Sequence, residues 1–376
     1  MEKIDVHAHA IPPAYRAHLV AYGHEHPDGM PSIPAWSAAS HLAFMEKMGI
    51  YMSILSITSP GTSLASHDDE LNRRITREAN DDLARTCREH SDKFRFFASL
   101  PLPDVDGALA EIDRVLDRDE QASEQQTGLA PGRMCVGFVI LSNAAGTYPG
   151  DKSLAPVWEK LNERKAVVFV HPTSCHLCPS SSATAGHGEP PTASASTSSR
   201  NGRRAVSSYH PLPVLPNPML EFPFDTTRAI VSLILSGTIQ RNPDVQIIIP
   251  HAGAVLPPLI ARFAAVSSFI VQAASATGQD AGVIAVSEQE VKKIFARRCY
   301  FDLSGTPFPD QLKMLLLVMP DARRILYGTD YPFTPGNALI AAKTVLDGAL
   351  LQFFPGEKAD KVMRENAAEC ILGQRE

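Results

Sequence analysis

Short apolar runs rich in β-branched and aromatic residues recur eight times along the chain, and the stretches between them carry helical spacing. The runs occupy residues 3–9, 51–58, 95–102, 134–142, 166–172, 245–253, 299–305 and 324–330. Most are continuously apolar rather than alternating, which is typical of parallel strands that are covered on both faces. The repeats predict an α/β protein with a (β/α)8 (TIM) barrel, closed by a C-terminal helix over residues 356–373.

An open, doubly wound sheet is the alternative arrangement of such repeats. No G-x-G-x-x-G follows the first strand, so the dinucleotide-binding form of that sheet has no support in the sequence. A chain of 376 residues can hold one large barrel or two ordinary domains. The regular recurrence favours one barrel domain over residues 1–376, with loop insertions.

Three stretches exceed what a minimal barrel needs. Residues 21–41 form a long proline-containing loop after the first strand, on the side where barrel enzymes build their sites, and residues 117–133 are polar. The third stretch is 173–218, whose middle is rich in Ser, Thr, Ala and Gly. Because this composition supplies too few apolar side chains to pack, we expect a mobile insert there.

Composition and charge exclude several classes of protein. The formal net charge of −6 and the pI near 6.1 leave no basic surface for nucleic acid. The sequence has no run of about 18 apolar residues, and its first residues lack the apolar core of a signal peptide. We therefore expect no membrane span and a cytoplasmic location, where the six cysteines stay reduced.

Histidines and one aspartate mark the carboxyl ends of four predicted strands. His7 and His9 end the first strand, His171 the fifth, His251 the sixth and Asp330 the eighth. Each alone has an ordinary alternative, such as a turn cap or a loop hydrogen bond. Strand ends of a barrel converge on one mouth, where four imidazoles and a carboxylate are costly to bury without a shared partner. Their joint placement predicts a metal site.

Four motifs around these residues resemble a known family. DVHAH, FVHP, IIIPHAGAVLP and LYGTDYPF are similar to the amidohydrolase superfamily, in its aminocarboxymuconate semialdehyde decarboxylase-like branch, from residue 3 to about 372. Within that branch, MEKIDVHAH, PDGMPSIPAWS and SILSITSPGT resemble fungal 6-methylsalicylate decarboxylases. The resemblance implies an enzyme, a metal-dependent carboxy-lyase (decarboxylase) of secondary metabolism that assembles into homodimers or larger homo-oligomers.

The resemblance also implies roles for the strand-end residues. His7, His9, His171 and Asp330 match the branch's metal ligands, and His251 matches its catalytic histidine. Three imidazoles and one carboxylate suit zinc, with manganese second. Two-metal members bridge their ions through a carboxylated lysine at the fifth strand end, where this chain has a histidine, so we expect one divalent metal. No organic cofactor is expected.

The substrate implied is a small aromatic carboxylic acid. Branch members that act on a dicarboxylate hold its second carboxylate with arginines, but Arg16 is the only arginine between Ala10 and Ser59. This favours a simple 2-hydroxybenzoate, above all 6-methylsalicylate, giving 3-methylphenol and CO2. Asp330 is the first candidate to protonate the ring carbon and His251 the second. A one-metal hydrolase or hydratase, acting on a small ester, lactone or amide, and a non-catalytic metal scaffold remain alternatives.

Further side chains near the predicted mouth are candidates for contact with the substrate or the metal ligands. Substrate contacts are expected from Trp36, Phe222, Ser304, Phe308 and Phe333. Asp302 is expected to orient a metal-binding imidazole. The CHLC of residues 175–178, near His187, resembles half a structural zinc site, but the second cysteine pair is missing. His18, His24 and His26 are expected to be solvated loop histidines.

Overall fold

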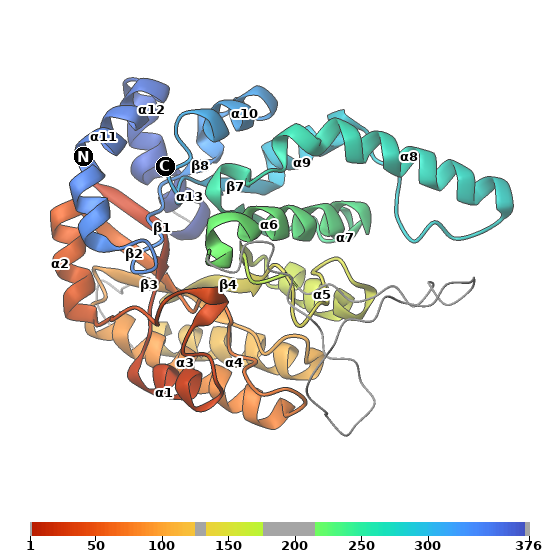
Figure 1. The fold of residues 1–376 in the computed structure, drawn as a ribbon. Coiled ribbons are helices and arrows are strands. Elements are labelled where there is room, and N and C mark those ends of the chain that lie inside the picture. Colours follow the sequence, from red (N-terminus) through yellow and green to blue (C-terminus); the bar gives the residue numbers. More distant parts are fainter. Residues whose placement is uncertain (1, 125–132, 176–214, 373–376) are drawn as a thin grey trace, which may run out of the picture.

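The strands form one parallel eight-stranded sheet in the order β1 to β8. The computed structural model describes residues 2–124, 133–175 and 215–372. The strands are β1 Lys3–His9, β2 Ile50–Ser56, β3 Phe94–Ser99, β4 Cys135–Leu141, β5 Val167–His171, β6 Gln246–Ile249, β7 Cys299–Asp302 and β8 Ile325–Leu326. The chain after β8 returns to β1, where the His9 N–H donates to the Tyr331 carbonyl at 2.8 Å. The predicted (β/α)8 barrel is confirmed (Figure 1).

Helices follow the strands and surround the sheet (Figure 1). The longer ones are α1 Pro13–Ala21, α2 Ala38–Met48, α3 Asp69–Glu89, α4 Val105–Glu124, α5 Ala155–Glu163, α6 Asn217–Leu235, α8 Ile260–Thr277, α9 Glu288–Arg298, α10 Asp310–Val318 and α11 Gly336–Phe353. A four-residue helix, α7 Thr238–Arg241, follows α6. The predicted closing helix is present as α12 Glu357–Asp360, a π-helical turn Lys361–Glu365 and α13 Asn366–Leu372, packed against β1, β4 and β8.

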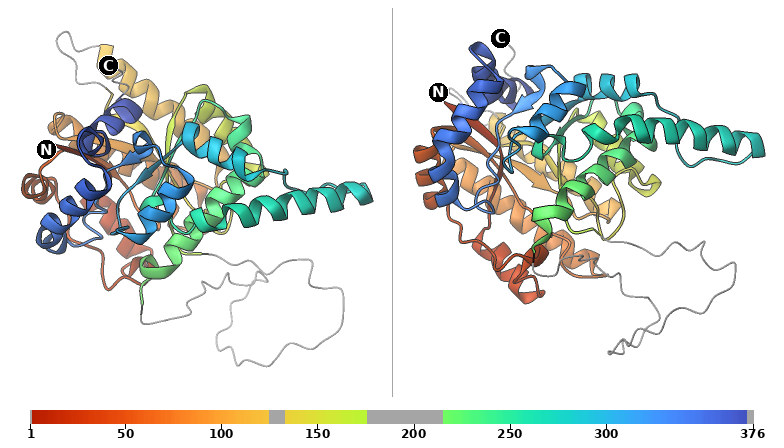
Figure 2. Two further views of the ribbon diagram at one scale, coloured as in Figure 1. Left: turned by 90° about the horizontal axis from the view of Figure 1, so that it is seen from above. Right: turned by 45° about the horizontal axis from the view of Figure 1, so that its top comes forward.

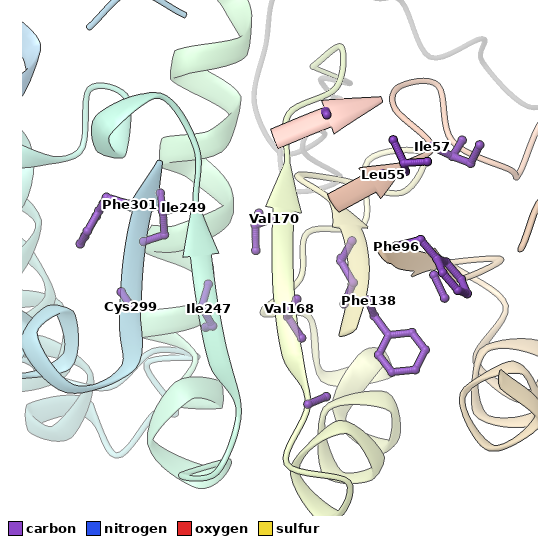
Figure 3. Close-up of a cluster of buried hydrophobic side chains, with 14 of the residues drawn as sticks. Leu55, Ile57, Phe96, Phe138, Val168, Val170, Ile247, Ile249, Cys299 and Phe301 are labelled. Carbon is purple, nitrogen blue, oxygen red and sulfur yellow. The ribbon is translucent and has the colours of Figure 1, made fainter. Parts of the chain in front are cut away.

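Buried apolar side chains lie on both faces of the sheet, which explains why the strands are continuously apolar. On β5, Val168 and Val170 face the helices, while Phe169 belongs to the cluster inside the barrel. Figure 3 shows part of the outer cluster, with Ile247 and Ile249 on the neighbouring strand β6. Because side chains alternate along a strand, His171 shares the inner face with Phe169.

The structure describes the 21–41 loop in full and the other two expected insertions in part. The polar stretch 117–133 begins as the end of α4 rather than as a loop, and residues 125–132 lie outside the described residues. The 21–41 loop contains a 3-10 turn, η1 Pro27–Gly29, and ends at the Ser37 cap of α2. Of the 173–218 insert, residues 176–214 lie outside the described part of the chain, so the expected mobility stays a prediction.

Helix α8 extends away from the barrel in the views of Figures 1 and 2, and α9, which contacts α8, packs on β7. The stretch His251–Thr277 is long and apolar enough to cross a membrane, with a mean hydropathy of 1.8, and 33% of it is buried. Apolar side chains of α8 are exposed, among them Phe269 at 70% and Val266 at 46%. The length and composition of one such helix are weak evidence for a span.

Candidate functional site

Four of the strand-end side chains meet at one mouth of the barrel. One ligand atom from each of His7, His9, His171 and Asp330 lies within 4.8 Å of the other three. The Asp330 Oδ1 is 3.1 Å from the His9 Nε2 and 3.5 Å from the His7 Nε2. All three imidazoles are buried. The structure thus brings together the set that the resemblance implies as metal ligands.

Hydrogen bonds fix the orientation of each imidazole. The Nδ1 of His7 donates to Asp302 Oδ2 at 3.0 Å, and that of His9 to Ser56 Oγ at 3.0 Å. The Nδ1 of His171 donates to the carbonyl of the next residue at 2.7 Å. With its proton on Nδ1, each ring turns a lone pair on Nε2 toward the shared space. This is the arrangement in which histidines bind metals.

The chemistry of this cluster fits a divalent cation. The Nε2 atoms of His7 and His9 are buried without a hydrogen-bond partner among the described residues, which a bound cation would satisfy. Burial raises the pKa of Asp330, but the His7 and His9 imidazoles that face its carboxylate outweigh burial and hold the pKa well below its usual value. Burial and the neighbouring imidazoles hold the pKa of His171 well below its usual value. A carboxylate and a neutral imidazole are the metal-binding forms of these groups.

Asp302 and Ser304 at the end of β7 support His7. Burial lowers the pKa of His7, but the Asp302 carboxylate more than offsets burial and raises it to about 10. A cation is therefore favoured at the His7 Nε2, and a bound metal ion would take the place of a proton there. The Ser304 hydroxyl lies 2.8 Å from the His7 Nδ1 and donates to Asp302 Oδ1 at 2.6 Å. Asp302 therefore lies where the sequence predicted, against a candidate ligand, whereas Ser304 faces the same ligand rather than the cavity.

The loop after β8 is attached to β1, and this attachment positions Asp330. Buried Asp5 accepts hydrogen bonds from the Thr329 N–H at 3.0 Å and hydroxyl at 2.6 Å. The Asp330 N–H donates to the His7 carbonyl at 2.7 Å. Asp330 itself has a φ of 62°, in the left-handed region that aspartate tolerates better than most residues. Sequence reasoning missed Asp5 and Thr329.

His251 lies beside the cluster rather than in it. Its ring centroid is 5.2 Å from that of His7, and burial together with the charge of His7 lowers its pKa to about 4. Gln311 donates to the His251 carbonyl at 2.5 Å. Gly305 packs against the ring so closely that an added Cβ would lie 2.7 Å from the His251 Cδ2. A neutral imidazole is thus held at the edge of the cluster.

A cavity of about 380 Å³ opens beside the cluster. It is lined by Asp28, Met30, Thr58, Ser59, His171, Pro218, Met219, Phe222, Pro223, His251, Gly305, Gln311, Asp330, Phe333 and Thr334. Phe222 and Phe333 are therefore where the sequence placed them. The Phe333 ring meets the His9 ring edge-on at 5.6 Å.

The other two aromatic candidates do not line this cavity. The Trp36 indole donates to His41 Nδ1 at 3.0 Å. Phe308 packs on Phe353 and lines a separate cavity of about 140 Å³ behind β7 and β8. Asp28 of the 21–41 loop and Met219 at the start of α6 line the cavity instead. The sequence signal for Asp28 was its Pro-Asp-Gly turn in a loop on the site side of the barrel.

Arg16 and the three expected loop histidines, His18, His24 and His26, lie outside the cavity. The expectation was wrong in part, because His18 lies in helix α1 rather than in a loop. Arg16 donates to the carbonyls of Ile33 and Pro34 and so holds the loop backbone. His18 pairs with Glu78 near the surface. Among the described residues that line the cavity there is no lysine or arginine. Of the CHLC stretch, Cys175 is buried near Tyr148, and residues 176–178 and 187 lie outside the described part of the chain.

Known proteins with similar sequences cover nearly the whole chain. Decarboxylase yanB of Aspergillus niger is 32% identical over 98% of this chain and 86% of its own length. The 6-methylsalicylic acid decarboxylase of Penicillium expansum is 28% identical over 94% of this chain and 97% of its own.

Solved structures show the same fold. A dihydroxybenzoic acid decarboxylase from Polaromonas sp. JS666, solved with manganese and the inhibitor 2-nitroresorcinol, superposes with a TM-score of 0.67 at 20% identity. The superposition covers 100% of this chain and 98% of that one. The sequence profile of the Amidohydrolase family matches residues 4–370. With this match across the barrel and its strand-end histidines, the chain belongs to the amidohydrolase family.

Proposed function

We propose that this protein is a metal-dependent, non-oxidative decarboxylase of a 2-hydroxybenzoate, with 6-methylsalicylate as the leading candidate and 3-methylphenol and CO2 as products, in fungal polyketide secondary metabolism. The observation that carries the proposal is the placement of three oriented imidazoles and one carboxylate beside a cavity with aromatic walls. The decarboxylases among its relatives support the reaction class. The absence of lysine and arginine from the described lining of this cavity favours a substrate with one carboxylate.

One divalent metal would be held by His7, His9, His171 and Asp330. The nitrogen-rich ligand set supports zinc as the first choice. The manganese of the Polaromonas structure supports manganese as the second. When bound, the ion supplies positive charge that neutralises the substrate's carboxylate and phenolate oxygens.

The residues of the chain then handle the ring and one proton. Phe222 and Phe333 offer flat apolar surfaces that orient the aromatic ring. Asp330 or His251 delivers a proton to the ring carbon that bears the carboxylate. The bond from that carbon to the carboxylate breaks, its electron pair restores the aromatic ring, and the carboxylate leaves as CO2.

The remaining proposals concern the whole molecule. We place the enzyme in the cytoplasm and treat residues 1–376 as one domain, in keeping with its single barrel. We propose a homodimer or larger homo-oligomer, which is supported by the branch resemblance and by the exposed apolar face of α8.

The reaction is tested by incubating purified, metal-loaded protein with a panel of hydroxybenzoates and measuring CO2 and the matching phenols. In deuterated water the phenol should carry one deuterium at the vacated carbon. His251→Ala should lower turnover about a hundredfold or more while keeping the metal, and His18→Ala, at a partly exposed position outside the cavity, is the control. If 2-hydroxybenzoates bind without releasing CO2 and an ester, lactone or amide is hydrolysed instead, the hydrolase alternative replaces this proposal.

A further inference from the structure

One acidic side chain of the cavity has no part in the chemistry above. Asp28 lies in η1, in the middle of the loop between α1 and α2, and lines the same cavity as His251 and Asp330. Asp28 and Asp330 are the two acidic side chains among the described residues of that lining. The backbone of Asp28 has a φ of 54°, in the left-handed region. This conformation is unfavourable for most residues other than glycine, so the turn holds Asp28 in place at a cost in free energy.

Hydrogen bonds fix the Asp28 carboxylate in place. Its Oδ1 accepts from the Ser174 N–H at 3.2 Å and from the Ser174 hydroxyl at 2.5 Å. Asn217, the first residue of α6, donates to Ser174 Oγ at 2.6 Å. Ser174 lies three residues beyond His171, the last residue of β5, so this network sits farther out along the chain than the candidate metal ligands.

Apolar side chains contribute to the wall of the cavity that Asp28 lines. Met30, Met219 and Phe222 line the cavity with it. Burial raises the pKa of Asp28, because its charged form loses contact with water there. A carboxylate has about four acceptor sites on two oxygens. The Ser174 bonds engage Oδ1, and the Ser59 hydroxyl supplies one further hydrogen bond, which leaves acceptor capacity for a substrate. A hydroxyl group of the substrate could therefore donate a hydrogen bond to the Asp28 carboxylate, which is partly shielded from water. In such a setting, a substrate that makes the hydrogen bond is favoured most strongly over one that lacks the donor.

We propose that Asp28 is a substrate-positioning residue that accepts a hydrogen bond from a second ring hydroxyl, remote from the reacting carboxylate. This inference rests on the proposed function and narrows its substrate class. Within the 2-hydroxybenzoates, Asp28 favours those that carry a further hydroxyl, so 2,4-dihydroxy-6-methylbenzoate would be a better substrate than 6-methylsalicylate, the leading candidate above. Asp28 would also repel a second substrate carboxylate, in agreement with the lack of basic residues in the described lining.

The test uses two acids that differ by one hydroxyl, 2,4-dihydroxy-6-methylbenzoate and 6-methylsalicylate. The 4-hydroxyl lies opposite the carboxylate on the ring. Because it also changes intrinsic reactivity, the quantity to compare is the ratio of the two kcat/KM values in wild type and in each variant. The ratio should fall about tenfold to a hundredfold in Asp28→Ala. Asp28→Asn, whose amide oxygen still accepts, should restore part of it.

Ser174→Ala is the matched control, because it removes the hydroxyl donor to Asp28 but keeps the backbone N–H donor and the Asp28 carboxylate. It should change both kcat/KM values alike. If Asp28→Ala lowers kcat/KM for both substrates by the same factor, Asp28 only stabilises the loops and the inference is wrong.

Binding of the product phenols separates this inference from the proposed reaction. Calorimetry should show that wild type favours 3,5-dihydroxytoluene over 3-methylphenol, and that Asp28→Ala loses the preference. If wild type decarboxylates neither acid but shows this Asp28-dependent preference, the reaction is wrong and the positioning role stands. If the preference is the same in both proteins, the positioning role is wrong whatever the reaction.

Discussion

At the scale of single residues, the site depends on side chains that touch no substrate. Asp302 accepts a hydrogen bond from the Nδ1 of His7, and the Ser304 hydroxyl contacts both the His7 ring and the Asp302 carboxylate. Partners of this kind set the tautomer and the direction of a ligand's lone pair. Gly305 allows the His251 ring to lie against its backbone. Both contacts lead to predictions that separate metal binding from turnover.

Asp302→Asn should weaken metal binding about tenfold to a hundredfold, because the neutral amide holds the His7 proton less strongly than the carboxylate does. Competition with a chelator, followed by elemental analysis, measures the change. Asp321→Asn is the control, since Asp321 pairs with Arg323 at the surface. Unchanged metal affinity in Asp302→Asn would remove the orienting role.

Gly305→Ala should lower turnover strongly while the metal content stays near one per chain. The new Cβ would come within 2.7 Å of the His251 Cδ2, so the ring must move. Gly278→Ala is a matched control: Gly278 also has a positive φ, +69° against +71°, but no atom lies within 4 Å of its added Cβ. Both variants carry the backbone strain of alanine at positive φ, and only the first should lose activity beyond its loss of stability.

At the scale of elements, the barrel strands position the cluster of candidate metal ligands. The connecting segments form much of the cavity wall. The loop between α1 and α2 meets the start of α6 through Asp28, Ser174 and Asn217. Between Ser174 and α6 lies the Ser-rich stretch of the sequence. Its few apolar residues suggest that the wall depends on the two ends of this insert rather than on its middle.

Replacing residues 180–203 with a short Gly/Ser linker should therefore keep most of the activity. Steady-state kinetics on the shortened protein, with circular dichroism to check the barrel, measures this. A folded barrel without activity would mean that the middle of the insert shapes the site or a subunit contact.

At the scale of the whole molecule, α8 extends from the barrel (Figure 2) and leaves apolar side chains exposed. We predict that this face takes part in self-association. The double variant Val266→Glu, Phe269→Glu should shift the protein to a smaller species in light scattering. Leu317→Glu, on α10 and 75% exposed, is the control for adding charge to an apolar surface position. An active wild-type monomer at working concentration would contradict the prediction.

The sequence by itself determined the barrel and the convergence of His7, His9, His171 and Asp330. Both follow from local patterns: apolar runs report strands buried on both faces, and strand ends of a barrel share one mouth. The roles of these residues as ligands, and of His251 in catalysis, remain predictions.

Only the tertiary structure decided which loop residues reach the cavity. Trp36 contacts His41, Phe308 contacts Phe353 and Ser304 contacts His7, so none of them lines the cavity. Asp28 of the 21–41 loop and Gln311 of α10 line it instead. No periodicity fixes these positions, because loop side chains are directed by turns with positive φ and by hydrogen bonds between segments far apart in the chain, such as Asp28 with Ser174. Local sequence therefore specified the strands and the cluster at their ends, while long-range contacts specified the shape of the space beside it.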